Sequence, residues 1–183
     1  MIAYIWYFTA YSFFGYLFEK AFAFATQAKR RVRKCFAMLP LCPVYGFSMC
    51  LIAATDSVTH ALPAARILWG GFLATAVEYV MHVYYERSLG VRFWDYSALH
   101  GNIKGRVCLL FSVVWGVLSA VSMEYIHPIL RAYFGTAPLL PTLILTAVLL
   151  FDARISAQIL RATHDTEALA WRRVASFQFK SGG

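Results

Sequence analysis

The sequence predicts an all-α fold: a polytopic integral membrane helical bundle of about five transmembrane helices. Of its 183 residues, 60% are hydrophobic and only 14% are charged. Soluble domains contain roughly 45–50% apolar and about 25% charged residues, so this composition is typical of a membrane protein. Several apolar stretches also reach the roughly 18–20 residues that cross about 30 Å of hydrocarbon.

The run lengths place the five spans at residues 2–25, 36–62, 67–86, 107–126 and 139–159. The first stretch has no basic leader or small-residue cleavage site and contains Glu19 and Lys20, which favours a retained helix over a signal peptide. We therefore expect a transmembrane domain over residues 1–160 and a basic cytoplasmic tail over residues 161–183. A polar interfacial loop follows the third helix.

The lysines and arginines predict the orientation. With the N-terminus outside, 14 of them fall on the cytoplasmic side, five of these within residues 29–34, and only Arg66 and Arg131 fall on the other. The positive-inside rule then predicts an external N-terminus and a cytoplasmic C-terminus. The expected location is the bacterial inner (cytoplasmic) membrane, as a multi-pass protein. The same rule accounts for the net charge of +8. No nucleic-acid partner is expected, since no recognition helix, zinc-finger spacing or basic-aromatic groove is readable.

Ionisable residues inside the first span need a physical reason, because a carboxylate at the bilayer centre costs about 2.5–3.5 kcal/mol. Ser12, Gly15 and Glu19 fall on one helix face. Small residues beside a carboxylate predict close helix packing with Glu19 turned inward. The alternative is that Glu19 reaches the cytoplasmic interface and pairs with Lys20 or the basic segment over residues 29–34.

The third span carries Glu78, His82 and Glu86 at intervals of four residues, so all three lie on one helix face. An inward-facing polar network or proton relay is the favoured interpretation. A divalent metal on these three residues is an alternative, although the spacing supplies only part of a coordination sphere. The simplest alternative places Glu86 at the interface and His82 in the core with a hydrogen bond. No cofactor other than this metal is expected.

The connection over residues 87–106 is dense in hydrogen-bonding groups. Trp94 and Tyr96 suit the headgroup level, and Ser97 or Asn102 is expected to cap a following helix. Arg106 suits a bidentate contact with a phosphate or carboxylate. Its alternative role is an ion pair with Asp95 that only shapes the loop.

Residues 40–46, PLCPVYG, are expected to break the second span near its inner end. Irregular backbone at membrane depth needs protein or water around it, so this segment, which includes Tyr45, should pack against the loop over residues 94–106. Glu124 and Asp152 are expected near the ends of the fourth and fifth spans. Function is therefore expected in the cytoplasmic half.

These segments resemble the motifs of the ABC-transporter type IV family, also called the CmpB-like permeases, over roughly residues 4–130. The resemblance rests on residues 11–19 (YSFFGYLFE), 40–46, 78–86, and 94–97 (WDYS) followed by 102–106 (NIKGR). Three positions depart from the family pattern: Leu39 stands where a glycine usually precedes the first proline, Lys20 follows Glu19, and His82 replaces a small or apolar residue.

The resemblance implies a permease-like transport component. Glu19, Glu78 and Glu86 would then line a polar pathway through the membrane. Asp95, Asn102 and Arg106 would lie at its cytoplasmic opening. The candidate binding residues are Glu19, Glu78, Glu86, Asp95, Asn102, Arg106, Ser12, Tyr45, Trp94 and Tyr96.

Two other functions use the same residues. An interfacial enzyme would act on an anionic lipid or prenyl-phosphate, with a carboxylate base and Arg106 at the headgroup, although no Ser-His-Asp, H-E-x-x-H or Cys-His pattern supports a specific reaction. An accessory or scaffold subunit would use the polar core for packing alone. The expected partners are the lipid bilayer and either a second copy in a homodimer or a separate ATPase subunit, because the chain has no G-x-x-x-x-G-K-[ST] loop.

Overall fold

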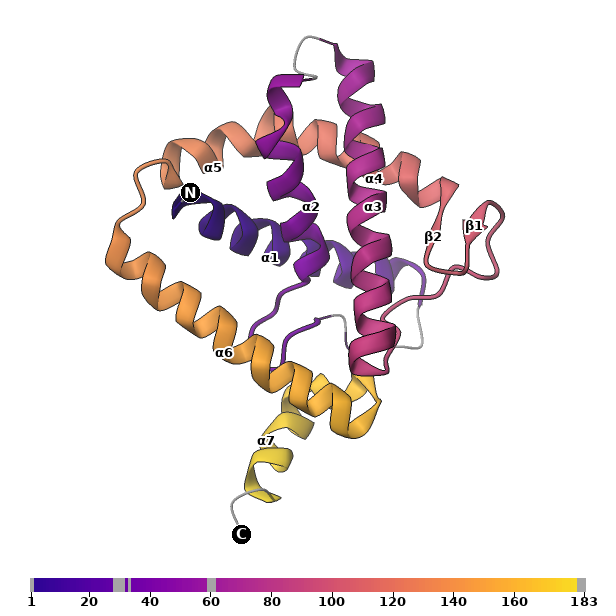
Figure 1. The fold of residues 1–183 in the computed structure, drawn as a ribbon, viewed down its shortest axis with the longest axis vertical. Coiled ribbons are helices and arrows are strands. Elements are labelled where there is room, and N and C mark those ends of the chain that lie inside the picture. The colour runs from indigo at the N-terminus through magenta and orange to yellow at the C-terminus, as the bar shows by residue number, and fades with distance from the viewer. Residues whose placement is uncertain (1, 28–31, 33, 59–61, 181–183) are drawn as a thin grey trace.

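The computed structural model describes residues 2–27, 32, 34–58 and 62–180, with side chains described as far as residue 175. Its regular secondary structure is helical apart from one short hairpin (Figure 1), which confirms the all-α prediction. The long helices are α1 (Ile2–Ala25), α2 (Pro43–Ala54), α3 (Pro63–Leu89), α4 (Leu109–Val121), α5 (His127–Phe134), α6 (Leu139–Thr163) and α7 (Trp171–Lys180). The short elements are η1 (Asp56–Val58), the strands β1 (Asn102–Ile103) and β2 (Val107–Cys108), the π-helical η2 (Ser122–Ile126) and η3 (Thr166–Leu169).

Successive helices send alternate ends to two sides of the molecule. In Figure 1, α1 and the continuous rod α4–η2–α5 run across α2 and α3, in opposite directions. The start of α1, the end of α2, the start of α3 and the α5–α6 connection lie toward the upper and left edges. The hairpin and the C-terminal helix lie toward the right and lower edges. The polar connection after the third helix is therefore gathered on the same side as the end of the chain.

Two helices are long and apolar enough to cross a bilayer among the residues that the structure describes: Leu109–Phe134, which joins α4, η2 and α5, and Leu139–Thr163. Their apolar side chains are largely uncovered; Leu150 and Phe151, for example, are 67% and 61% exposed. Rows of exposed apolar side chains of this length are stable against lipid and costly against water. Both helices are therefore candidate membrane-spanning helices.

The limits of the second and fourth predicted spans were wrong. The expected helix over residues 36–62 is only α2, which has 12 residues and is about 18 Å long. Residues 34–42 are irregular, and the helix begins at Pro43, since proline is tolerated only in the first turn. The fourth span, expected to end at residue 126, continues to Phe134.

The helices approach one another at glycines. A Cβ on Gly116 of α4 would lie 2.4 Å from the carbonyl oxygen of Ile67 in α3, and one on Gly15 of α1 would lie 2.3 Å from the Tyr45 ring in α2. Small residues allow backbones to come this close, which is a common way to pack membrane helices.

A π-helical turn interrupts the long rod just before Pro128. Proline lacks an N–H group, and its ring clashes with the carbonyl group four residues earlier, here that of Glu124 in η2. The wider turn of η2 accommodates this clash without ending the helix, and it re-aims Ser122 and Ile126 toward the interior.

Candidate functional site

The first-span face predicted from the sequence meets α2. Glu19 accepts a hydrogen bond of 2.8 Å from the Tyr45 hydroxyl group, so its carboxylate reaches α2. Gly15 provides the space for the Tyr45 ring, and Ser12 is fully buried where Gly46 packs against it. The alternative pairing with the basic segment concerns Lys29, Arg30, Arg31 and Arg33, which lie outside the described residues.

Glu78 is the most enclosed carboxylate of the third-span stripe, with 5% of its surface exposed. It accepts hydrogen bonds from the Tyr96 hydroxyl group (2.9 Å) and the Trp115 indole N–H (3.2 Å). Burial and the Glu78 carboxylate raise the pKa of Tyr96 well above its usual value, so the hydroxyl group keeps its proton and donates. Glu78 therefore ties α3 to both the polar loop and α4.

His82 and Glu86 point to different partners from those of Glu78. His82 is 3% exposed, and its Nε2 lies 3.1 Å from the carbonyl oxygen of Trp94, an acceptor, so Nε2 carries a proton. Its Nδ1 lies 4.0 Å from a Glu86 oxygen. Glu86 also accepts hydrogen bonds from Arg92, and from Nε (3.2 Å) and Nη2 (2.7 Å) of Arg106.

Arg106 is held by this contact and by the Tyr79 hydroxyl group, 3.1 Å from Nη1, and the pKa of its guanidinium is raised by the hydrogen bonds to Glu86. The alternative role of Arg106, an ion pair with Asp95, is wrong: Asp95 instead accepts hydrogen bonds from the Ser97 side chain and from the Ser97 N–H (2.9 Å), which lower the pKa of its carboxyl group. The partner of Arg106 is Glu86, on α3.

The polar loop closes as a hairpin and not as the capped helix expected at Ser97 or Asn102. Asn102 donates to the carbonyl oxygen of Leu99 (2.7 Å) and accepts from the Gly105 N–H (2.9 Å), which shapes the turn between β1 and β2. Trp94 donates its indole N–H to the carbonyl oxygen of Arg106 at 2.8 Å. These bonds hold Tyr96 over Glu78.

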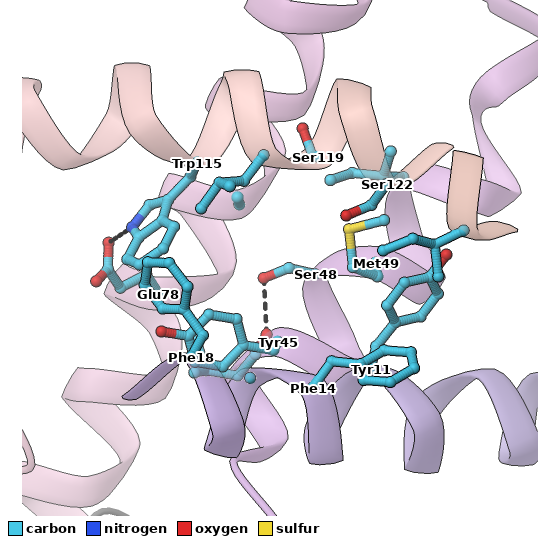
Figure 2. A pocket seen from close by; sticks show the side chains of 16 residues that line it. Tyr11, Phe14, Phe18, Tyr45, Ser48, Met49, Glu78, Trp115, Ser119 and Ser122 are labelled. Carbon is cyan, nitrogen blue, oxygen red and sulfur yellow. Dashed lines mark hydrogen bonds between the residues drawn. The ribbon is translucent and has the colours of Figure 1, made fainter. Parts of the chain in front are cut away.

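Two adjoining cavities lie beside Glu78. The larger, about 240 Å³, lies between α1, α2, α3 and the α4–η2 rod. The smaller, about 120 Å³, lies between the residue 40–46 segment and the polar loop, which are thus packed together as expected. Tyr45, Glu78 and Trp115 line both cavities. Figure 2 shows Glu78 and Trp115 closing one end of the larger cavity, next to Phe18 and Tyr45, with Met49 and Ser122 at the far end.

The sequence interpretation missed two important residues. Trp115 lies in the middle of an apolar span, far from the interfacial positions that tryptophan usually takes in a membrane helix. This unusual position was the signal in the sequence that could have identified it. Asp152, expected near a helix end, lies well inside α6 and is 1% exposed. Its carboxylate accepts hydrogen bonds from the backbone N–H groups of three consecutive residues, Ala37, Met38 and Leu39.

Lys34 lies in the same loop and is 4% exposed. Its Nζ donates to the carbonyl oxygen of Ala37 and lies 4.4 Å from the centre of the Trp171 ring. Burial lowers the pKa of this lysine to about 8, against the opposing effect of Asp152. Lys34 thus joins the irregular loop to the C-terminal helix.

The candidate residues therefore form two connected groups and not one stripe. Glu19, Tyr45, Glu78, Tyr96 and Trp94 surround the smaller cavity. Glu86, Arg92 and Arg106 form an ion-pair cluster beside it, with Asp95 and Asn102 in the hairpin turn. As far as the described residues go, no three His, Cys, Asp or Glu side chains come close enough to hold a metal ion.

Comparison with known proteins gives one match. The family model described as "Putative ABC-transporter type IV" matches residues 6–157. No curated protein and no solved structure matches the chain. The match covers the helices from α1 through most of α6, and it includes every candidate residue named above. The chain therefore belongs to the ABC-transporter type IV family.

Proposed function

We propose that this chain is the membrane-embedded, permease-like component of a transport system in the bacterial inner membrane, with its solute site at the joined cavities beside Glu78. The single observation that supports this role most strongly is the position of these cavities. They lie between four helices of a membrane protein in an ABC-transporter family, and a buried carboxylate lines both of them. Intramembrane carboxylates that face cavities are typical of substrate and ion pathways.

In this proposal five helices cross the membrane, with the N-terminus outside and the polar loop and C-terminus in the cytoplasm. The grouping of connections on two sides of the molecule supports this topology, as does the excess of basic residues in the segments assigned to the inside. A separate ATPase subunit supplies the hydrolysis, and it docks on the cytoplasmic side. A second copy of the chain would supply the helices that enclose the remaining side of the pathway. An interfacial enzyme and a scaffold remain the alternatives.

The test compares solute distributions in living cells. Cells that produce the wild-type chain, Glu78→Gln or Glu124→Gln are analysed by untargeted mass spectrometry of cytosol and medium. Glu124→Gln is the matched control, because Glu124 is an exposed carboxylate that pairs with Arg66 and does not line either cavity.

A defined set of solutes should change its inside-to-outside ratio with the wild-type chain and with Glu124→Gln, but not with Glu78→Gln at equal membrane abundance. Identical solute ratios in all three strains and in cells without the protein would contradict a transport role.

A further inference from the structure

Among the residues that the structure describes, no lysine or arginine side chain pairs with the charge of Glu78. Both of its hydrogen-bond donors, the Tyr96 hydroxyl group and the Trp115 indole, are neutral. The ion pairs formed by the described lysine and arginine side chains involve Asp56, Glu86, Glu124 and Asp165, and none involves Glu78. A buried carboxylate is costly unless a proton or a cation neutralises it.

Aromatic rings surround the same carboxylate. Trp115 contacts Tyr45 at 5.5 Å and Phe111 at 5.7 Å between ring centres, and Phe111 stacks on Tyr96 at 4.9 Å. All four rings line the smaller cavity together with Phe18. The faces of such rings carry negative potential and attract cations, and quaternary ammonium groups bind among aromatic rings for this reason.

The larger cavity offers apolar space next to these rings. Met49, Ile52 and Leu118 are among its lining side chains. The Ser48 and Ser119 hydroxyl groups, which also line it, donate to carbonyl oxygens of their own helices. Together the cavities of about 240 and 120 Å³ lie at the lower end of the roughly 300–1,000 Å³ range of small-molecule sites.

We infer that the joined cavities bind an organic ammonium cation with an apolar substituent. The ammonium group lies among Glu78 and the aromatic rings of the smaller cavity, and the apolar part extends between α1, α2 and the α4–η2 rod. The buried Glu78 carboxylate disfavours an anion at this place. An inorganic divalent cation would need several oxygen ligands that the described residues do not bring together. This inference names the substrate class of the proposed permease and therefore rests on that proposal.

The experiment uses the full chain in lipid nanodiscs and two probes that share a benzyl group: benzyltrimethylammonium and the anion phenylmethanesulfonate. Binding is measured by isothermal titration calorimetry for the wild-type chain, Glu78→Gln, Phe111→Leu and the control Glu124→Gln. Thermal unfolding and size-exclusion profiles establish that each variant is folded. Phe111→Leu removes a cage ring without touching a hydrogen bond, so the inference stays testable if Glu78→Gln does not fold.

Saturable binding of the ammonium probe to the wild-type chain and to Glu124→Gln is expected, with no binding of the sulfonate. Glu78→Gln and Phe111→Leu should each weaken binding by about tenfold or more, equivalent to roughly 1.4 kcal/mol. Absence of ammonium binding, equal binding of both probes, or unchanged affinity in the folded variants would overturn the inference. If the solute ratios in cells depend on Glu78 but no ammonium binds, the transport proposal stands without this substrate class. If ammonium binds but no solute ratio changes, the transport proposal fails instead.

Discussion

At the scale of single residues, Asp152 has the clearest structural role. Its two carboxylate oxygens accept four hydrogen bonds from the backbone N–H groups of Ala37, Met38 and Leu39, at distances between 2.6 and 3.1 Å. Residues 34–42 have no regular secondary structure that could pair these donors. Unpaired N–H groups at this depth would cost free energy, so the carboxylate replaces the partners that a helix would provide.

Asp152→Asn should therefore destabilise the protein. The amide supplies one acceptor oxygen where the carboxylate has two, and its NH₂ group faces backbone donors. We expect a loss of roughly 1.5–3 kcal/mol in the free energy of unfolding, the usual contribution of hydrogen bonds to a charged group. The measurement is the thermal unfolding midpoint in detergent. Asp165→Asn is the control, because Asp165 pairs with Arg173 at an exposed site, where ion pairs contribute about 0–1 kcal/mol. Equal midpoints for the two variants would contradict this role.

Residue spacing in the sequence predicted which side chains share a helix face, but not what each one touches. The i, i+4 rule correctly placed Glu78, His82 and Glu86 along one stripe of α3. The partner of Arg106 depends on how the loop folds over α3, and the hairpin turns it toward Glu86 instead of Asp95. Contacts of this kind lie between segments far apart in the chain, where local spacing carries no information.

At the scale of elements, the α1–α2 contact depends on glycine. Gly15 lies against the Tyr45 ring, and Gly46 lies against Ser12, so each helix contributes one glycine to a close approach. This packing aims the Tyr45 hydroxyl group at Glu19 and forms one wall of both cavities. Helix separation here would open the site.

Gly15→Ala should push α2 away from α1, because the added Cβ would lie 2.3 Å from the Tyr45 ring. Overpacking of this kind costs about 1–3 kcal/mol in unfolding free energy. The thermal midpoint should fall, and hydrogen exchange in residues 43–49 should become faster. Ala21→Val adds larger bulk to an exposed position of the same helix and should leave both readouts unchanged. If both variants behave alike, the glycine contact does not control this interface.

The presence of the long helices could be predicted from the sequence, because long apolar runs and the prolines that interrupt them are local signals. The third and fifth spans differ from α3 and α6 by a few residues at their ends. The second span was overestimated because apolar composition continues through residues 36–42, whereas the backbone there is irregular and held by Asp152. The start of α2 thus depends on a tertiary contact between Leu39 and Asp152, which lie more than a hundred residues apart in the sequence.

At the scale of the whole molecule, the polar groups gather at one end. The start of the polar loop (residues 91–94), the residue 34–42 segment and the C-terminal η3 and α7 helices contact a shared core that includes Leu89, Leu160 and Leu169. Trp171 donates its indole N–H to the carbonyl oxygen of Met38, so the C-terminal segment packs on the irregular loop. The proposed topology puts this end in the cytoplasm.

Thiol labelling tests that topology. Ala64→Cys, at the start of α3, and Ala98→Cys, in the polar loop, both replace exposed alanines, which the proposed topology assigns to opposite sides of the membrane. A membrane-impermeant maleimide should label Ala64→Cys in intact cells and Ala98→Cys only after permeabilisation. The unaltered chain, with Cys35, Cys42 and Cys108 buried, gives the background. The reverse labelling pattern would invert the topology.

The most direct measurement of the central claim, a ligand site centred on Glu78, is capture of the natural ligand. Purified full chain in nanodiscs is equilibrated with a solute extract of its host cells, washed, and analysed by mass spectrometry beside Glu78→Gln and Glu124→Gln. The wild-type chain and Glu124→Gln should retain the same small group of solutes, and Glu78→Gln should retain none of them. Equal retention by all three proteins, or by none, would contradict the claim.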